Sequence, residues 1–105
     1  MIVTALISEK AKEIDFQIAR IKIKEEGVKN LEVPREDMTV EFPIGRVTER
    51  ILVTVETRAE KYFEESNRLH AAELIGGIIE DTFGAKIEVK FLVLGREFSS
   101  VYLSG

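Results

Sequence analysis

The sequence contains no cysteine, one histidine and two prolines among its 105 residues. Without cysteine the chain forms no disulfide, and thiolate chemistry and zinc–sulfur sites are excluded. One histidine excludes a multi-histidine metal site within a single chain. No apolar run reaches membrane-spanning length, and the apolar start at residues 1–7 is too short for a signal peptide. We therefore expect a cytoplasmic protein that has no membrane association and no cofactor.

Composition places the chain among globular proteins. The hydrophobic fraction of 45% is enough for a real core, and 32% of the residues are charged. We expect one domain over residues 1–105. The net charge of −4 argues against a dedicated nucleic-acid binder. Frequent Glu and Ile with scarce Asn and Gln resemble the composition of proteins from hot environments.

Residues 58–84 are the stretch around which the rest of the chain is organised. They are rich in helix formers and end at Gly84, where a helix C-cap belongs. The second half carries an apolar stripe with helical spacing, and the first half carries another stripe that is out of phase with it. The pattern predicts either a helix that breaks at Ser66-Asn67, both good N-cap residues, or one long helix that buries two faces. The second alternative needs a partner outside the chain.

Two adjacent glycines, Gly76 and Gly77, lie inside the stronger stripe. Helix-interior glycines cost about 1 kcal/mol each relative to alanine, so they need a packing role. Ala72 lies one turn before Gly76 and extends the same flat surface. The sequence favours tight packing on the chain's own sheet, and the alternative is a helix contact between two copies. With the apolar end of a later strand, the interface candidates are Ala72, Gly76, Gly77, Leu92 and Leu94.

Several segments alternate apolar and polar residues as strands do. A strand that is buried on both faces, or is at least central in its sheet, is predicted near residues 2–7, because both sets of alternate residues are apolar there. Further strands are predicted at 38–42, from Val47 or Arg50 to Thr57, at 85–94 and at 98–103, with a turn at residues 95–97. The far end of the 85–94 strand is expected to be covered on both faces.

Residues 8–27 fit two structures. Ser8 and Gly27 suit the start and end of a helix, and the isoleucines between them keep helical spacing. Ile14, Phe16 and Ile18 also alternate, as in a strand with a bulge. A helix at 8–26 predicts a ferredoxin-like α+β sandwich, in which an antiparallel sheet in the order β-α-β-β-α-β plus a C-terminal strand carries helices on one face. A strand there predicts six strands and a single long or broken helix at 58–83.

The polar residues offer few candidates for chemistry. His70 is the side chain that titrates near neutrality, and Glu73 follows it by one helical turn, but two ligands do not make a metal site. No catalytic residue stands out, and a structural or solvated histidine is favoured. Arg46, Arg50 and Arg96 lie near predicted turns and are the nucleic-acid candidates.

The sequence predicts more apolar surface than so short a chain would bury in one core, and this surplus decides the leading functional hypothesis. We predict a small non-catalytic interaction domain that self-associates, as a homodimer or another homo-oligomer, and has room for a further protein partner. The first alternative is a module that binds single-stranded nucleic acid through the turn arginines. The second is a small enzyme whose site lies at a subunit interface near His70.

Overall fold

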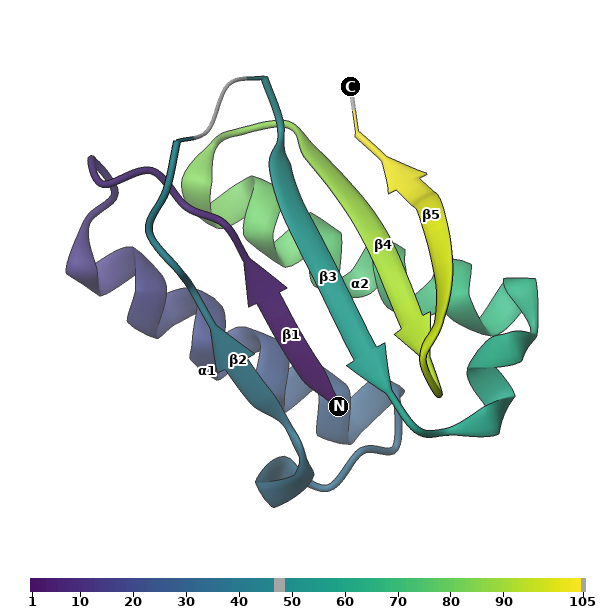
Figure 1. Cartoon of the computed structure of the whole chain (residues 1–105). Helices are drawn as coiled ribbons and strands as arrows, with labels where there is room; N and C mark the ends of the chain where they lie inside the picture. Colours follow the sequence, from purple (N-terminus) through teal and green to yellow (C-terminus); the bar gives the residue numbers. More distant parts are fainter. Residues whose placement is uncertain (47–48, 105) are drawn as a thin grey trace.

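The computed structural model describes residues 1–46 and 49–104. The chain contains two consecutive β-α-β units and a final strand (Figure 1). The first unit consists of β1 (Ile2–Ala5), α1 (Glu13–Asn30) and β2 (Thr39–Glu41). The second consists of β3 (Ile51–Thr57), α2 (Glu65–Phe83) and β4 (Ile87–Val93). Strand β5 (Arg96–Leu103) follows, and two short 3-10 helices, η1 (Arg35–Asp37) and η2 (Glu60–Phe63), precede β2 and α2.

The five strands form one mixed sheet in the order β2-β1-β3-β4-β5. Within each β-α-β unit the two strands are neighbours and run parallel, whereas β1 pairs with β3, and β4 with β5, in antiparallel orientation. Both helices cover the same face of this sheet (Figure 1). The prediction of an antiparallel, ferredoxin-like sheet is therefore wrong, although a sheet with two helices on one face was expected.

Strand direction is the property that the sequence pattern did not reveal. Alternation of apolar residues shows which side chains share a face, but it carries no information on which strands are neighbours. A helical crossover joins parallel strands, and these strands can be direct neighbours or can have another strand between them. Here each crossover brings the chain back directly beside the strand that it left, so parallel pairs replace the antiparallel pairs of the predicted sheet.

The ambiguous segment at residues 8–27 is helical, so the alternative of a bulged strand and a six-stranded sheet is wrong. The helix α1 begins after Lys12 rather than at Ser8, and it continues past Gly27 to Asn30. Gly27 has a packing role instead of ending the helix, because a Cβ atom there would lie 2.0 Å from the Met38 sulfur. The inward face of α1 carries Ala19 and Ile23, both fully buried.

The organising stretch is broken, as one of the two alternatives predicted. The break lies at Glu64, between η2 and α2, and not at Ser66-Asn67. The two apolar stripes are out of phase because they belong to two separate helical segments. Gly84 ends α2 in the left-handed conformation, with φ of 62°, and its N–H group donates to the Glu80 carbonyl, so the predicted C-cap is confirmed.

Two strand predictions need correction. Strand β1 is central in the sheet, as one of the two predicted alternatives had it, but within the single chain it is buried on one face only, because Ile2 remains 42% exposed on the other. The turn between the last two strands consists of Leu94 and Gly95, both with positive φ, as a two-residue hairpin requires. Leu94 is therefore 47% exposed in a turn, and the far end of β4 is not covered on both faces. Val47, the earlier of the two predicted starts of β3, lies outside the described residues.

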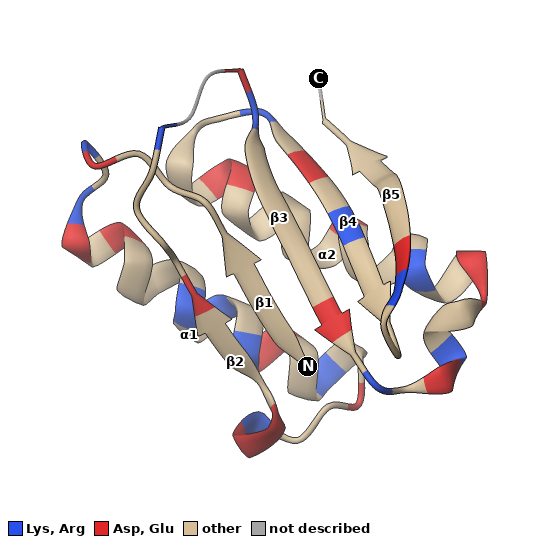
Figure 2. Cartoon of the chain, viewed as in Figure 1, with Lys and Arg blue, Asp and Glu red and all other residues tan. Residues whose placement is uncertain are grey.

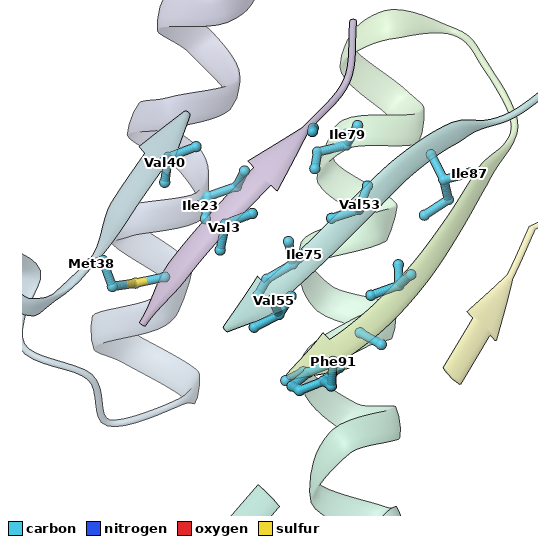
Figure 3. Close-up of a cluster of buried hydrophobic side chains, with 14 of the residues drawn as sticks. Val3, Ile23, Met38, Val40, Val53, Val55, Ile75, Ile79, Ile87 and Phe91 are labelled. Atoms are coloured by element: carbon cyan, nitrogen blue, oxygen red, sulfur yellow. The ribbon is translucent and has the colours of Figure 1, made fainter. Parts of the chain in front are cut away.

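The core lies between the sheet and the two helices (Figure 3). Alternate residues of β1, β3 and β4 point toward the helices, and Ile75 and Ile79 of α2 meet them. Strand β4 contributes the largest apolar side chain of this layer, Phe91, which is fully buried. Among the described residues, no helix covers the opposite face of the sheet (Figure 1), and we call it the open face.

Charged residues of both signs are interspersed over the described elements (Figure 2). This mixture fits the small negative net charge and gives no extended field of one sign. Within residues 1–46 and 49–104, neither helix has the length and apolar character needed to cross a bilayer. The cytoplasmic location expected from the sequence stays a prediction.

The two adjacent glycines of α2 provide a matched pair for a stability test. A Cβ atom at Gly76 would lie 2.3 Å from Cδ1 of Ile87, whereas a Cβ atom at Gly77 would meet nothing within 4 Å. Gly76→Ala should lower the free energy of unfolding by about 1–3 kcal/mol because it overpacks the helix–sheet contact. Gly77→Ala should raise it by about 0.5–1 kcal/mol through helix propensity. Urea denaturation of both variants checks the opposite signs, and equal effects would contradict the packing of α2 on β4.

Candidate active site

A solvent-open cavity of about 620 Å³ lies at the end of the sheet where β1 begins and β3 ends. The segment after α1 forms one wall, and the segment from the end of β3 through η2 forms the other. We call it the N-terminal cavity. Its lining residues are Met1, Leu31, Glu32, Val33, Pro34, Asp37, Thr57, Arg58, Ala59, Lys61 and Tyr62.

Tyr62 is the most unusual residue of this lining. It is 2% exposed, and its ring packs against Phe91 of the core with a centroid distance of 5.8 Å. Its buried hydroxyl has no hydrogen-bond partner among the residues that the structure describes. Burial raises the pKa of Tyr62 above its ordinary value of 10.0, so the hydroxyl keeps its proton at neutral pH. A protonated hydroxyl without a partner can donate a hydrogen bond to an oxygen of a bound molecule.

Two cations line the same cavity as Tyr62. Arg58 is exposed and follows directly after β3. Lys61 lies over the Tyr62 ring, with 5.3 Å between its Nζ atom and the ring centroid, and Nζ donates to the Leu31 carbonyl at 3.2 Å. The cavity therefore offers two positive charges to an anion, while Glu32 and Asp37 provide carboxylates in the opposite wall.

Backbone contacts hold the two walls in place. The Met1 nitrogen donates to the Asp37 carbonyl at 2.7 Å, and the Ala59 N–H group donates to Oγ1 of Thr57 at 3.1 Å. Glu32 has a φ of 56°, a left-handed conformation that is uncommon for a residue other than glycine. Strained residues of this kind cluster at functional sites, because the surrounding structure must hold them there.

Arg68 of α2 fixes the turn that presents Tyr62. Its guanidinium NH1 donates to the carbonyls of Tyr62 at 3.0 Å and of Phe63 at 2.7 Å. The same group stacks on Phe98 of β5, with 3.7 Å between the guanidinium carbon and the ring centroid. Arg68 is only 9% exposed, so these contacts lie in a largely desolvated place. The side chain therefore joins η2, α2 and β5.

His70 and Glu73 do not form a centre with other polar residues. Both are exposed on α2, and Glu73 faces the groove between the two helices. Among the described residues, no group of three or more His, Asp or Glu side chains is close enough to hold a metal ion. Neither residue lines the N-terminal cavity.

The three arginine candidates for nucleic-acid binding are separated. Arg50, at the start of β3, donates to the carbonyls of Ile87 and Ser104 and so fastens the end of the chain to the sheet. Arg46 lies near Ser8 at the same end. Arg96 begins β5 at the opposite end of the sheet, because β3 and β4 are parallel and β5 is antiparallel to them. The fold therefore does not combine them into one basic surface.

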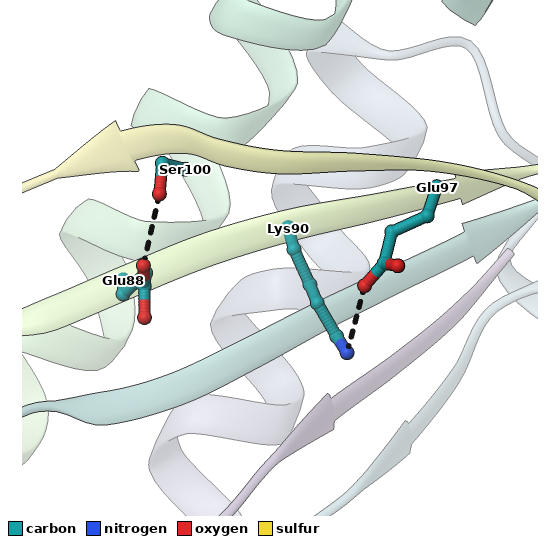
Figure 4. A network of polar contacts seen from close by, with 4 residues as sticks. All are labelled: Glu88, Lys90, Glu97 and Ser100. Carbon is teal, nitrogen blue, oxygen red and sulfur yellow. Dashed lines mark hydrogen bonds and ion pairs between the residues drawn. The ribbon is translucent and has the colours of Figure 1, made fainter.

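The interface candidates occupy four different environments, one of which is the exposed turn that holds Leu94. Ala72 and Gly76 are buried against this chain's own sheet, which accounts for their small size. Gly77 faces the groove between the helices, and Leu92 is half-buried on the open face of β4. Beside Leu92, the open face carries polar links from β4 to β5, in which Lys90 pairs with Glu97 at 3.3 Å and Ser100 donates to Glu88 at 3.0 Å (Figure 4). An interface role for the exposed candidates stays a prediction.

Comparison with known proteins gives similarity of fold without similarity of sequence. No family model matches the chain, and no curated protein matches it. Solved structures with the same fold include a fused 4-OT wild-type symmetric trimer, at 9% identity and a TM-score of 0.76 over 89% of this chain and 85% of that one. Malonate semialdehyde decarboxylase matches at 15% identity and a TM-score of 0.68, with coverage of 89% and 84%. Macrophage migration inhibitory factor from Oncomelania hupensis matches at 19% identity and a TM-score of 0.68, with coverage of 89% and 86%.

These neighbours show that the chain shares its fold, a mixed five-stranded sheet with two helices, with the fused 4-OT, malonate semialdehyde decarboxylase and macrophage migration inhibitory factor structures. They also contradict the prediction of a non-catalytic interaction domain, because structures with this fold include enzymes such as the decarboxylase. The alternative of a nucleic-acid module has no support from these structures or from the separated arginines. The sequence-based functional hypothesis is therefore replaced.

Sequence reasoning missed the N-terminal cavity. Tyr62 belongs to the apolar stripe in the first half of residues 58–84, which indicates packing only, and no motif singles out the adjacent cation Lys61. One signal was available, because Arg58, Lys61 and Tyr62 follow directly after the clearest predicted strand. Side chains at strand ends often line sites, but nothing in the sequence showed that the wall after α1 lies opposite.

Proposed function

We propose that the chain is a small enzyme whose active site is the N-terminal cavity. The observation that carries the proposal is Tyr62, whose buried hydroxyl has no partner in the described chain and whose side chain lines the N-terminal cavity together with Arg58 and Lys61. Leaving a buried donor unsatisfied costs about 1–3 kcal/mol, so an arrangement of this kind needs a compensating role. Hydrogen bonding to a substrate would supply one.

The chemistry of the cavity suits a small carboxylate that also carries a carbonyl group. The two cations would bind the carboxylate, and the Tyr62 hydroxyl would donate to the carbonyl oxygen. The fold neighbour malonate semialdehyde decarboxylase is named for a substrate of this class. That similarity supports the substrate class for this chain, and the charges in the cavity are its independent support.

The proposed step is proton transfer next to the carbonyl. A carboxylate of the opposite wall, Glu32 or Asp37, takes a proton from the carbon beside the carbonyl group. The electron pair of the broken C–H bond moves to form the carbon–carbon double bond of an enolate, and the negative charge develops on the oxygen that Tyr62 hydrogen-bonds. Returning the proton completes the exchange. Replacing Glu32 by Gln and Asp37 by Asn, separately, identifies the base.

The proposal does not depend on a proline at the start of the first strand. The decarboxylase neighbour was also solved as a mutant in which its first residue, a proline, is replaced by alanine. The present sequence has Met1 and Ile2 at the start of β1, and its two prolines are Pro34 and Pro43. The catalytic groups proposed here therefore come from other parts of the cavity.

Solvent exchange tests this function. The protein is incubated in deuterated water with a panel of three- and four-carbon oxo acids, including malonate semialdehyde and oxaloacetate, and deuterium incorporation beside the carbonyl is followed by NMR. We expect catalysed exchange of at least one member. Rates equal to those of buffer for every member, at substrate concentrations that saturate small-molecule enzymes, would overturn the proposal.

We further propose that the chain forms a homo-oligomer, with a trimer as the expected size. The fused 4-OT neighbours are described as symmetric and asymmetric trimers. In this chain, the open face of the sheet leaves Ile2 42% and Leu52 37% exposed, and neighbouring copies would cover them. Sedimentation velocity gives the mass, and Leu52→Glu should shift it toward the monomer. A wild-type monomer at high micromolar concentration would contradict this assembly.

A further inference from the structure

Helix α1 carries an apolar seam on the side that faces away from the core. Ile14, Ile18, Ile21 and Val28 are between 37% and 55% exposed, and they follow each other at intervals of four, three and seven residues. This is the spacing of the apolar positions in a coiled coil, with Glu25 at the remaining position. The inward face of α1, with Ala19 and Ile23, packs on the core. The outer seam therefore points away from the core and has no covering partner within the described chain.

The charges beside the seam indicate which partner fits. At about 100° per residue, one flank carries Asp15, Lys22 and Lys29, so it runs from acidic to basic along the helix. Two copies of α1 in parallel orientation would place like charges together. Two antiparallel copies would place Asp15 of each beside Lys29 of the other, which gives two opposite-charge pairs against one contact between the two Lys22 side chains at the symmetry axis. A helix of this charge pattern therefore fits a second copy of itself in antiparallel orientation.

The groove next to the seam gives a second reason to expect a second copy of α1 as the partner. It lies between α1 and α2, has a volume of about 530 Å³, and presents the carboxylates of Glu25, Glu26, Glu73 and Asp81 with Lys22 as its basic member. Its floor is open at Gly77, where a Cβ atom would meet nothing within 4 Å. Positive charge on a helical surface complements this groove, and the flank of α1 in a second copy brings Lys22 and Lys29.

We propose that the outer seam of α1 is a two-fold contact between two copies of this chain. The contact lies on the helix side of the molecule, whereas the proposed trimer uses the open face of the sheet. The two contacts are independent, and together they would join oligomers in pairs. A charge pattern that is acidic at one end and basic at the other disfavours an anionic membrane surface as the occupant, because Glu13, Asp15 and Glu25 would face it.

Cysteine cross-linking tests the contact and its orientation, because the natural chain has no cysteine. Ile21→Cys places a thiol next to the predicted axis, so mild oxidation should convert most of the protein into a disulfide-linked dimer. Ile14→Cys alone should not cross-link, because the two thiols would lie at opposite ends of the contact, on the order of 20 Å apart. Mixing Ile14→Cys chains with Val28→Cys chains should restore the link.

Each other outcome has a definite meaning. Cross-linking of Ile14→Cys as efficient as that of Ile21→Cys would overturn the antiparallel arrangement, and no cross-linking of Ile21→Cys would overturn the contact.

The double variant Ile18→Glu with Ile21→Glu should halve the sedimenting mass, with its circular dichroism spectrum confirming that α1 still folds. Leu52→Glu is the matched control on the open face, and it should leave the Ile21→Cys cross-link intact. Binding of the wild type to anionic vesicles without any cross-link would assign the seam to a lipid surface and refute the proposal.

Discussion

Replacing Tyr62 by phenylalanine should lower the turnover number for the oxo-acid reaction by about 100- to 1,000-fold, the usual cost of removing one donor to a developing oxyanion. The same substitution should raise the free energy of unfolding by about 1–2 kcal/mol, because it removes a buried hydroxyl that has no partner in the described part of the folded chain. The ring and its packing on Phe91 stay in place. A variant that is more stable and less active is the pattern expected of a group kept for function.

Steady-state kinetics and urea denaturation of the same preparation measure both effects. Tyr102→Phe is the matched control, since Tyr102 is the other tyrosine and lies half-buried on β5 outside the cavity. It should change neither the turnover number nor the pH profile. Unchanged turnover in Tyr62→Phe would remove the proposed catalytic role, and a large loss of stability would show that the hydroxyl has a structural partner.

Replacing Arg68 by alanine should lower the free energy of unfolding by about 3–5 kcal/mol. The substitution deprives two carbonyls of a charged donor and removes the guanidinium from the Phe98 ring. Because one of those carbonyls belongs to Tyr62, activity should fall even under conditions in which the variant remains folded. Arg68→Lys should recover part of the stability, since one ammonium group reaches a carbonyl but cannot reproduce the stacking and the fixed geometry of the guanidinium.

Arg96 is the matched control for this experiment. Its guanidinium lies over the same Phe98 ring, with a distance of 5.1 Å to the centroid, but Arg96 is exposed. Arg96→Ala should therefore cost less than about 1 kcal/mol, as contacts of exposed cations with aromatic rings do. Equal losses in the two variants, followed by chemical denaturation, would contradict the role assigned to the buried arginine.

Local patterns predicted the helices and strands better than they predicted the sheet. The Gly84 cap correctly predicted the end of α2. The two out-of-phase stripes of residues 58–84 led to two alternatives, of which the broken helix is right. The predicted position of the break is wrong. The chain breaks at Glu64, an ordinary helix former, whereas the sequence pointed to Ser66-Asn67 because these are better capping residues. Parallel pairing of β1 with β2 depends on how α1 crosses over, which periodicity does not encode.

The candidate site was beyond the sequence for a related reason. Its two walls, residues 31–37 and 57–62, meet only because the first β-α-β unit lies beside the second. Tyr62 has an apolar ring and belongs to the apolar stripe in the first half of residues 58–84, so its spacing indicates burial only, and it is 2% exposed. The unpartnered hydroxyl that gives it a chemical role becomes visible only when its neighbours are placed. His70 attracted attention as the single histidine, yet it is exposed and lies outside the cavity.

The most direct measurement of the central claim is an NMR titration of the isotope-labelled protein with malonate, a dicarboxylate that has no aldehyde or ketone group to react. We predict saturable shifts of the backbone amides of Ala59, Lys61 and Tyr62, and their loss in Arg58→Ala. The matched comparison is the cavity of about 310 Å³ at the other end of the sheet, where Lys10 and Lys12 also offer positive charge. Shifts confined to that cavity, or none at either end, would contradict the assignment of the N-terminal cavity as the active site.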